Sequence, residues 1–506
     1  MSKQVSSKDI KSSKLNAFTN YLSFGINMIL GLIASPLVLE YLGSTNFGIY
    51  KAVQKILGFA TVADGRATQA LKWVIAKNEG STDEQKKKQA IGSALLVWFI
   101  FLPILIIVIC LLVYFMPSLI NELDHEQIYN VRKLTLLLGT NLFLISLIGI
   151  SNSVLVGTNQ GYKSILVKIF WMVVFNIVLI YILYLGYGFT GIGIVTLLFT
   201  ILQGINVYYL AKKHVKWFGV LQPNKKDLKT FLNFSGWTLM WVFVSKLLLS
   251  SEIILLSYIS GGSSVSNYVF SSYIIQIGIT IAALLTSSLT PTLGKVYGGD
   301  DYSSVEKIIK NLRNLVFSWT IFIGGINLLF NKLFISYWVG VEYYVGDIPN
   351  LLFVILMVEL VIIRNEAFII NVSIQIKEKV FVGAFSVILS LLFAYSFSFF
   401  FTDQIIGILL GLLIGRLIML LGYPYLVSKY LRVKVTLKMD AFKKIITSTI
   451  LLATTYFIGI NLEIESILLL ISLVLISTIT LAIIIFKFLV PVDLQSFIQK
   501  KIIKLK

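Results

Sequence analysis

The sequence is divided into about fourteen apolar stretches, most of them long enough to cross a bilayer as a helix of roughly 20 residues. Within lipid, a helix satisfies its own backbone hydrogen bonds, whereas an open sheet or an irregular loop does not. The chain is therefore predicted to be an all-α integral membrane protein with about fourteen transmembrane helices. Composition agrees, because 57% of the 506 residues are hydrophobic, 13% are charged, and the mean hydropathy is +0.87.

Lysine and arginine gather in every second gap between these stretches, and the intervening gaps carry acidic residues instead. Arg313, for example, is counted with the cytoplasmic cations that follow the eighth stretch, whereas Glu122, Asp124 and Glu126 lie in an intervening gap. This positive-inside pattern predicts that both termini are cytoplasmic. The net charge of +19 is then mostly a topology signal that favours anionic membrane lipids, and no nucleic-acid partner is expected.

The longest basic loop, at 212–230, divides the chain into two halves with six predicted helices each. The predicted organisation is a cytoplasmic N-terminal tail (1–15), an N-terminal lobe (16–211), the inter-lobe loop (212–230), a C-terminal lobe (231–426), two further helices (444–489) and a cytoplasmic C-terminal tail (490–506). An even number of helices per half gives both halves one orientation, so we expect a parallel pseudo-repeat around a central cavity. Glycines at 407, 411 and 415 recur every fourth residue and predict close packing between helices.

A few basic residues fall inside the predicted spans, where each costs a few kcal/mol if it faces lipid. Lys51, Lys55 and Arg66 lie within about 60° of one another on a continuous helix over 46–70, whereas Asp64 would face elsewhere. The Asp64–Gly65 step is also a candidate break in that helix. Together with Lys246 and Arg416, the three form the predicted lining of a cavity for an anionic substrate, most simply a phosphate or pyrophosphate.

The remaining charged residues inside the spans are candidates for ion coupling or for structural ion pairs, and the sequence leaves that choice open: Asp64, Glu252, Glu359, Arg364 and Glu366. Glu359 and Glu366 are seven residues apart and share a helix face, with Arg364 almost opposite. The two glutamates suit coupling to a cation, and equally one of them could pair with Arg416.

Enzymatic motifs are missing from the sequence. No phosphate-binding loop precedes a Lys-Ser/Thr pair, which excludes an ATP-driven pump of that type. Both histidines, His125 and His214, fall in predicted loops, which excludes Ser/His/Asp catalysis and a histidine proton relay in the membrane. We therefore expect neither an enzyme nor a bound cofactor or metal.

Several short motifs resemble the Wzx-type polysaccharide flippases of the multidrug/oligosaccharidyl-lipid/polysaccharide exporter superfamily. They are Pro36 followed by Tyr41-Leu42-Gly43, the run 46–50 (Asn-Phe-Gly-Ile-Tyr), the Asp64-Gly65 step and the stretch 334–340 (Phe-Ile-Ser-Tyr-Trp-Val-Gly). Arg66-Ala67-Thr68 replaces the family's more usual leucine-glycine run, which leaves the role of Arg66 open. The resemblance implies a two-lobed bundle around a central cavity with alternating access. Coupling to H⁺ or Na⁺ is typical of the superfamily, and the sequence does not indicate which ion this chain would use.

The same resemblance implies a substrate, a place and partners. The substrate class would be an undecaprenyl-pyrophosphate-linked oligosaccharide, moved across the bacterial cytoplasmic membrane during synthesis of surface polysaccharide such as O-antigen. Membrane lipids and other polysaccharide-assembly proteins would be its partners. The alternatives are a lipid II or teichoic-precursor flippase, which shares the mechanism, and a multidrug exporter of the same superfamily. An exporter of organic cations calls for an acidic cavity, whereas this membrane interior carries more basic than acidic groups.

Overall fold

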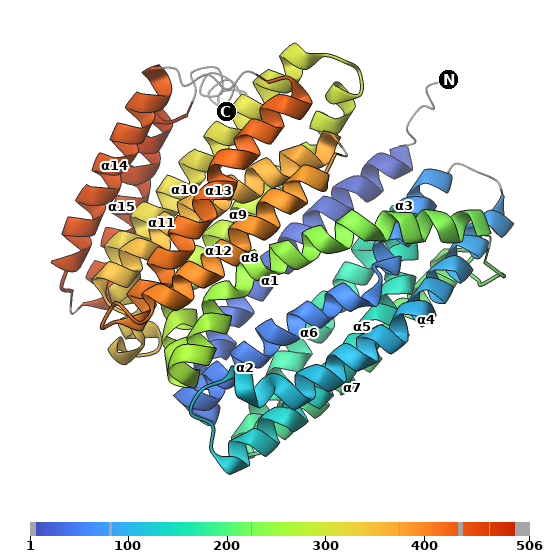
Figure 1. Ribbon diagram of the computed structural model, residues 1–506, viewed down its shortest axis with the longest axis horizontal. Coiled ribbons are helices and arrows are strands. Elements are labelled where there is room, and N and C mark those ends of the chain that lie inside the picture. Colours follow the sequence, from blue (N-terminus) through green and yellow to red (C-terminus); the bar gives the residue numbers. More distant parts are fainter. Residues whose placement is uncertain are drawn as a thin grey trace. The chain divides into compact units, whose positions relative to one another are not determined.

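A computed structural model describes residues 7–79, 83–223, 225–373, 375–433, 439–464 and 466–490, and those residues contain helices and no strand (Figure 1). The described part of the chain thus has the predicted all-α fold class. The predicted C-terminal tail lies almost entirely outside the described residues. α1 begins at Ser7, within the segment that was expected to be the N-terminal tail. The chain forms two compact units that meet between Val265 and Ser266, and each is described here by itself.

The first unit holds most of the N-terminal helices. They are α1 (Ser7–Leu42), α2 (Ser44–Leu57), η1 (Gly58–Asp64), α3 (Ala67–Asn78), α4 (Glu84–Phe115), η2 (Met116–Leu119), α5 (His125–Gly157), α6 (Gly161–Tyr184), α7 (Gly188–His214) and α8 (Lys225–Ser271), which runs on into the second unit. α5 packs against α3, α4 and α7, and α6 packs against α1 and α7 (Figure 1). Leu71, Ile91 and Val154 are among the fully buried residues of the core between α3, α4 and α5.

α8 is bound to the rest of the first unit along its C-terminal half. The backbone N–H of Asn121 donates to the carbonyl of Ser257 (2.8 Å), and the Asn121 side chain donates to the carbonyl of Ile259 (3.1 Å). Gly261 has a φ of 75°, which kinks α8 at a position that favours glycine. The stretch of α8 before this kink therefore belongs to the first unit by its contacts.

The second unit is built from the remaining helices. They are α9 (Tyr273–Tyr297), α10 (Tyr302–Trp338), η3 (Val341–Tyr343), α11 (Asp347–Ile370), η4 (Asn371–Ser373), α12 (Lys377–Phe397), α13 (Gln404–Leu431), α14 (Met439–Ile460) and α15 (Ile467–Phe488). α10 contacts α9, α11, α14 and α15, while α13 contacts α11 and α12 (Figure 1). α10 is thus the helix around which this unit is assembled.

The contact between α12 and α13 confirms the packing predicted from the glycine repeat. A Cβ added at Gly407, Gly411 or Gly415 of α13 would overlap the backbone of α12 or of the residue that follows it. The hydroxyl of Ser386 on α12 donates to the carbonyl of Gly415 (2.7 Å). Glycine is required here because the two backbones approach more closely than any side chain allows.

Twelve helices in the described part of the chain are long and apolar enough to cross a membrane, so the protein is a multi-pass membrane protein. Two further predicted spans correspond to α2–η1–α3, over residues 46–70, and to α11. Both are helical, and both carry several charged residues. The structure therefore agrees with the prediction of about fourteen spans, one of which, α2–η1–α3, is interrupted.

Candidate functional site

The second predicted span is interrupted where the sequence carries Asp64 and Gly65. η1 ends at Asp64, and α3 begins at Ala67. Between them, Gly65 (φ 65°) and Arg66 (φ 51°) adopt the left-handed conformation, which costs about 1–2 kcal/mol for a residue other than glycine. The Asp64 carboxylate accepts a hydrogen bond from the backbone N–H of Arg66 (Oδ1···N 2.9 Å) and so stabilises the turn. The predicted helix break is confirmed.

This interruption places Asp64 among the basic residues. Lys246 on α8 lies within electrostatic range of Lys55, Arg66 and Asp64. Its Nζ would lie 3.6 Å from a Cβ added at Gly58, at the start of η1. The expectation that Asp64 faces away from the basic stripe is wrong, because it assumed one continuous helix.

Two side chains supply further partners for these charges. Glu252, which is 7% exposed, lies on α8 within electrostatic range of Lys55. The hydroxyl of Ser146 on α5 makes a long hydrogen bond to Asp64 (Oγ···Oδ2 3.5 Å). From the sequence, Glu252 was a candidate either for ion coupling or for a structural ion pair. In the structure its charge partly neutralises that of Lys55, a cation of the predicted site.

Lys51 occupies an aromatic environment one turn before Lys55 on α2. Its Nζ lies 5.0 Å from the ring centre of Phe47 and 5.3 Å from that of Tyr50, within the range of cation–π attraction. Gln54 donates to the Tyr50 hydroxyl (2.7 Å) and so fixes that ring. Lys51 and Lys55 are also close enough to repel each other. An anion beside them would relieve this repulsion.

Four cations and two carboxylates thus come together in the first unit. We name them the basic cluster: Lys51, Lys55, Arg66 and Lys246, with Asp64 and Glu252. Phe59 of η1 and Phe243 of α8 are in edge-to-face contact, with their ring centres 5.9 Å apart, and this contact links η1 to α8 beside the cluster. The cluster keeps a net positive charge at the depth of the predicted spans, which favours an anionic ligand.

In the second unit, Glu366 has a partner that the sequence did not predict. Arg313 on α10 donates two parallel hydrogen bonds to its carboxylate, Nε···Oε1 at 2.7 Å and Nη2···Oε2 at 2.5 Å. Glu366 is 2% exposed and Arg313 30%. Arg313 was counted with the cytoplasmic cations, so the sequence predicted no partner for it inside the membrane.

Glu359 and Arg416 are buried in the same unit. Glu359 on α11 is 4% exposed and Arg416 on α13 is 1% exposed. Their two helices pack against each other. Arg416 lies in the second unit and the basic cluster in the first, so its predicted place in the same cavity remains a prediction.

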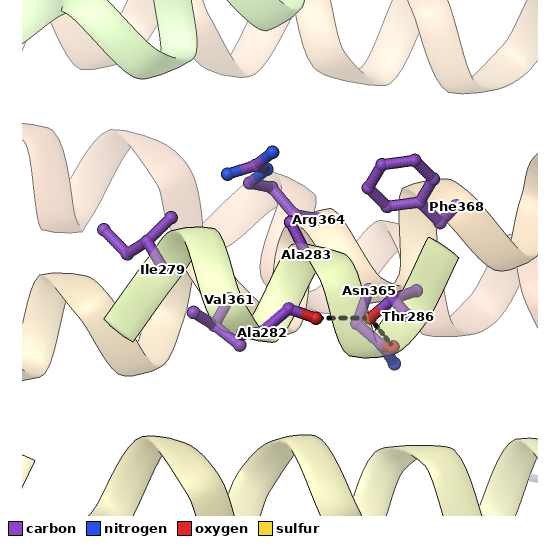
Figure 2. A pocket seen from close by; sticks show the side chains of 8 residues that line it. All are labelled: Ile279, Ala282, Ala283, Thr286, Val361, Arg364, Asn365 and Phe368. Carbon is purple, nitrogen blue, oxygen red and sulfur yellow. Dashed lines mark hydrogen bonds between the residues drawn. The ribbon is translucent and has the colours of Figure 1, made fainter. Parts of the chain in front are cut away.

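Arg364 lies on a different side of α11. It lines a small depression between α9 and α11, together with Ile279, Ala282, Ala283, Thr286, Val361, Asn365 and Phe368 (Figure 2). The hydroxyl of Thr286 is hydrogen-bonded to the side-chain oxygen of Asn365 (3.0 Å). The structure therefore separates Arg364 from the ion pair formed by Glu366.

The described residues contain no group of three or more His, Cys, Asp or Glu side chains that could hold a metal ion. The chemistry available in the basic cluster is that of ammonium and guanidinium groups in a surrounding of low dielectric constant. Such groups bind phosphate and pyrophosphate by charge-assisted hydrogen bonds.

Comparisons with known proteins agree with this fold. The model of a family described as polysaccharide biosynthesis protein matches residues 13–297. No curated protein matches the sequence. Among solved structures, a lipid II flippase MurJ in an inward closed conformation superposes with a TM-score of 0.67 at 18% identity, covering 94% of this chain and 99% of that one.

Multidrug transporters have a similar fold. An inward-facing multidrug resistance transporter of the MATE family and MOP superfamily gives a TM-score of 0.63 at 18% identity, covering 82% of this chain and 96% of that one. An outward-facing MATE transporter gives 0.62 at 15% identity, covering 84% and 96%. At these identities, the likeness concerns the fold alone.

Proposed function

The chain belongs to the polysaccharide biosynthesis protein family, and we propose that it is a flippase for an undecaprenyl-pyrophosphate-linked oligosaccharide. It would move this substrate across the bacterial cytoplasmic membrane by alternating access, with both termini in the cytoplasm. Lipid-linked oligosaccharide and membrane lipids are its proposed partners. Transport of this kind needs no catalytic group, in keeping with the expectation that the chain is not an enzyme.

The observation that carries the proposal is the basic cluster. A pyrophosphate carries at least two negative charges, and in a bilayer each charge needs a partner. Lys51, Lys55 and Lys246 supply ammonium groups, while Arg66 supplies a guanidinium. The half-buried carboxylate of Asp64 and the buried carboxylate of Glu252 neutralise part of this charge and leave an excess that a diphosphate would balance.

A lipid II or teichoic-precursor flippase is the second candidate. The solved flippase of that kind covers 94% of this chain, against 82% for the inward-facing drug transporter. Such a substrate would use the same cluster, because it also carries a pyrophosphate or phosphate on a polyprenyl chain. The proposed site is less suited to organic cations, since its net charge is positive.

Deletion of the gene tests the proposal directly. We expect loss of surface polysaccharide and accumulation of lipid-linked repeat units on the cytoplasmic side of the membrane. Intact surface polysaccharide combined with arrest of peptidoglycan synthesis would favour lipid II as the substrate. Intact polysaccharide combined with greater sensitivity to cationic dyes would favour a drug exporter.

The site has its own test in single variants. Lys55→Gln, Lys246→Gln and Arg416→Gln should each reduce export of the glycan at least tenfold, because each removes a charge-assisted contact. Lys216→Gln, in the loop before α8, is the matched control. Protein levels in the membrane should be unchanged, as measured by immunoblotting. Normal export by all three variants would disprove the basic site.

A further inference from the structure

Arg364 stands apart from the other intramembrane cations of the second unit. Arg313 is engaged by Glu366, and the ammonium group of Lys379 is hydrogen-bonded to the side chain of Asn371. Among the described residues, the Arg364 guanidinium has no hydrogen bond, no ion pair and no charged neighbour that acts on it. A half-buried guanidinium at this depth calls for an anionic partner.

The position of the side chain argues against simple contact with water at the nearer helix end. Arg364 lies six residues before Ile370, the last residue of α11, and a helical side chain leans toward its own N-terminus. Figure 2 shows the guanidinium leaning toward the side of Ile279 and Val361, away from Phe368. It therefore points back along α11, toward the interior of the predicted span.

The surroundings of Arg364 restrict the kind of anion. Thr286 and Asn365 are the other polar residues that line the depression. Thr286 bonds to the carbonyl of Ala282 (3.1 Å) and to Asn365 (3.0 Å), and the amide of Asn365 reaches Glu366 (3.4 Å). The rest of the lining is aliphatic or aromatic. Apart from the guanidinium, little is left to bind sugar hydroxyls.

We propose that Arg364 binds the phosphate or pyrophosphate of a lipid. This inference rests on the proposed function, because it gives the second unit its own contact with a phosphate-bearing lipid. That lipid could be the transported polyprenyl pyrophosphate or an anionic phospholipid of the bilayer. A guanidinium presents two parallel donors to phosphate, so arginine is better suited to this role than lysine.

Native mass spectrometry of the full chain in detergent can count bound lipids and rank their affinities. The probes are farnesyl pyrophosphate, farnesol as its uncharged counterpart, and a short-chain phosphatidylglycerol. Arg364→Gln should weaken binding of farnesyl pyrophosphate about 10- to 100-fold and leave farnesol unchanged. Arg364→Lys should bind farnesyl pyrophosphate with an affinity between those of the unaltered protein and of Arg364→Gln. Lys332→Gln on α10 is the matched control.

The outcomes separate the sources of the phosphate. Loss of farnesyl pyrophosphate binding with phosphatidylglycerol unaffected assigns the site to a polyprenyl substrate, whereas an equal loss of both assigns it to bulk anionic lipid. Unchanged binding of both by Arg364→Gln and Arg364→Lys would overturn the site. If the unaltered protein fails to move lipid-linked oligosaccharide in vesicles while the Arg364 effect persists, the proposed function fails and the site remains.

Discussion

Glu366 shows why a carboxylate inside a membrane span does not by itself identify a coupling site. The sequence grouped it with Glu359 as a possible cation site, yet Arg313 binds it through two hydrogen bonds. Bidentate pairing of this kind satisfies both charges and links α10 to α11. Glu359 is the other buried glutamate of α11, and it lies in the same unit as the buried Arg416.

Removing the Glu366 charge should destabilise the second unit. Glu366→Gln leaves Arg313 without its counterion, and we expect a loss of about 1–3 kcal/mol, moderated because Arg313 is 30% exposed. Thermal unfolding in detergent measures this change. The matched control is Glu306→Gln, an exposed residue of α10. The double variant Arg313→Gln/Glu366→Gln should recover part of the stability that Glu366→Gln loses. If Glu366→Gln alone were as stable as the control, the stabilising role of this pair would be contradicted.

The sequence identified which charges lie inside the spans, but could not pair them. Periodicity places a residue on a face of its own helix, as it did for Glu359 and Glu366. It contains no information about how far α10 is rotated against α11, and that rotation brings Arg313 to Glu366. Asp64 was misplaced because one continuous α-helix was assumed, whereas residues 58–64 form a 3-10 helix and Gly65 and Arg66 are left-handed.

At the scale of elements, glycine patterns were the more reliable guide. The repeat at Gly407, Gly411 and Gly415 predicted a close helix contact, and α12 and α13 make that contact. The Asp64–Gly65 step predicted a break, and η1 ends there. Both signals are local, because they depend on the absent side chain of glycine and not on distant partners.

Adding one methyl group to this contact should be costly. A Cβ at Gly411 would overlap backbone atoms of Phe393 and Ala394, so Gly411→Ala must push α12 and α13 apart, at about 1–3 kcal/mol. Gly25→Ala on α1 is the matched control, because its Cβ would have no neighbour within 4 Å. The two unfolding temperatures compare them directly. Equal stability of the two variants would mean that the helices are not packed through Gly411.

At the scale of the whole molecule, α8 packs with a different set of helices from the one that its place in the sequence predicts. The loop at 212–230 separates it from the first six predicted helices, yet its residues up to Val265 pack within the first unit. Lys246 and Glu252 enter the basic cluster only through this packing. The sequence could not predict that α8 packs within the first unit. Loop lengths and loop charges indicate where the chain crosses the membrane, but they do not indicate which helices are in contact.

A split protein would test the attachment of α8. Fragments 1–223 and 225–506, co-expressed, should purify together, because Asn121 and Phe59 contact α8. Gly262→Val in the second fragment should reduce recovery severalfold, since a side chain there would overlap the carbonyl of Thr45. Gly294→Val on α9, where a Cβ meets nothing within 4 Å, is the matched control. Independent elution of the two unaltered fragments would contradict this packing.

The interruption and the charges of α2–η1–α3 have a consequence for biogenesis. None of its helices has the length of a span, since α2 has 14 residues, η1 has 7 and α3 has 12, and the segment carries Lys51, Lys55 and Arg66. Each such cation opposes partition from the translocon into lipid by about 2.5–3.5 kcal/mol at the centre of a span. The segment must therefore enter the bilayer with help from neighbouring helices such as α1 and α5, which contact α2. The residues that the proposed transport needs most are those that membrane insertion resists most strongly.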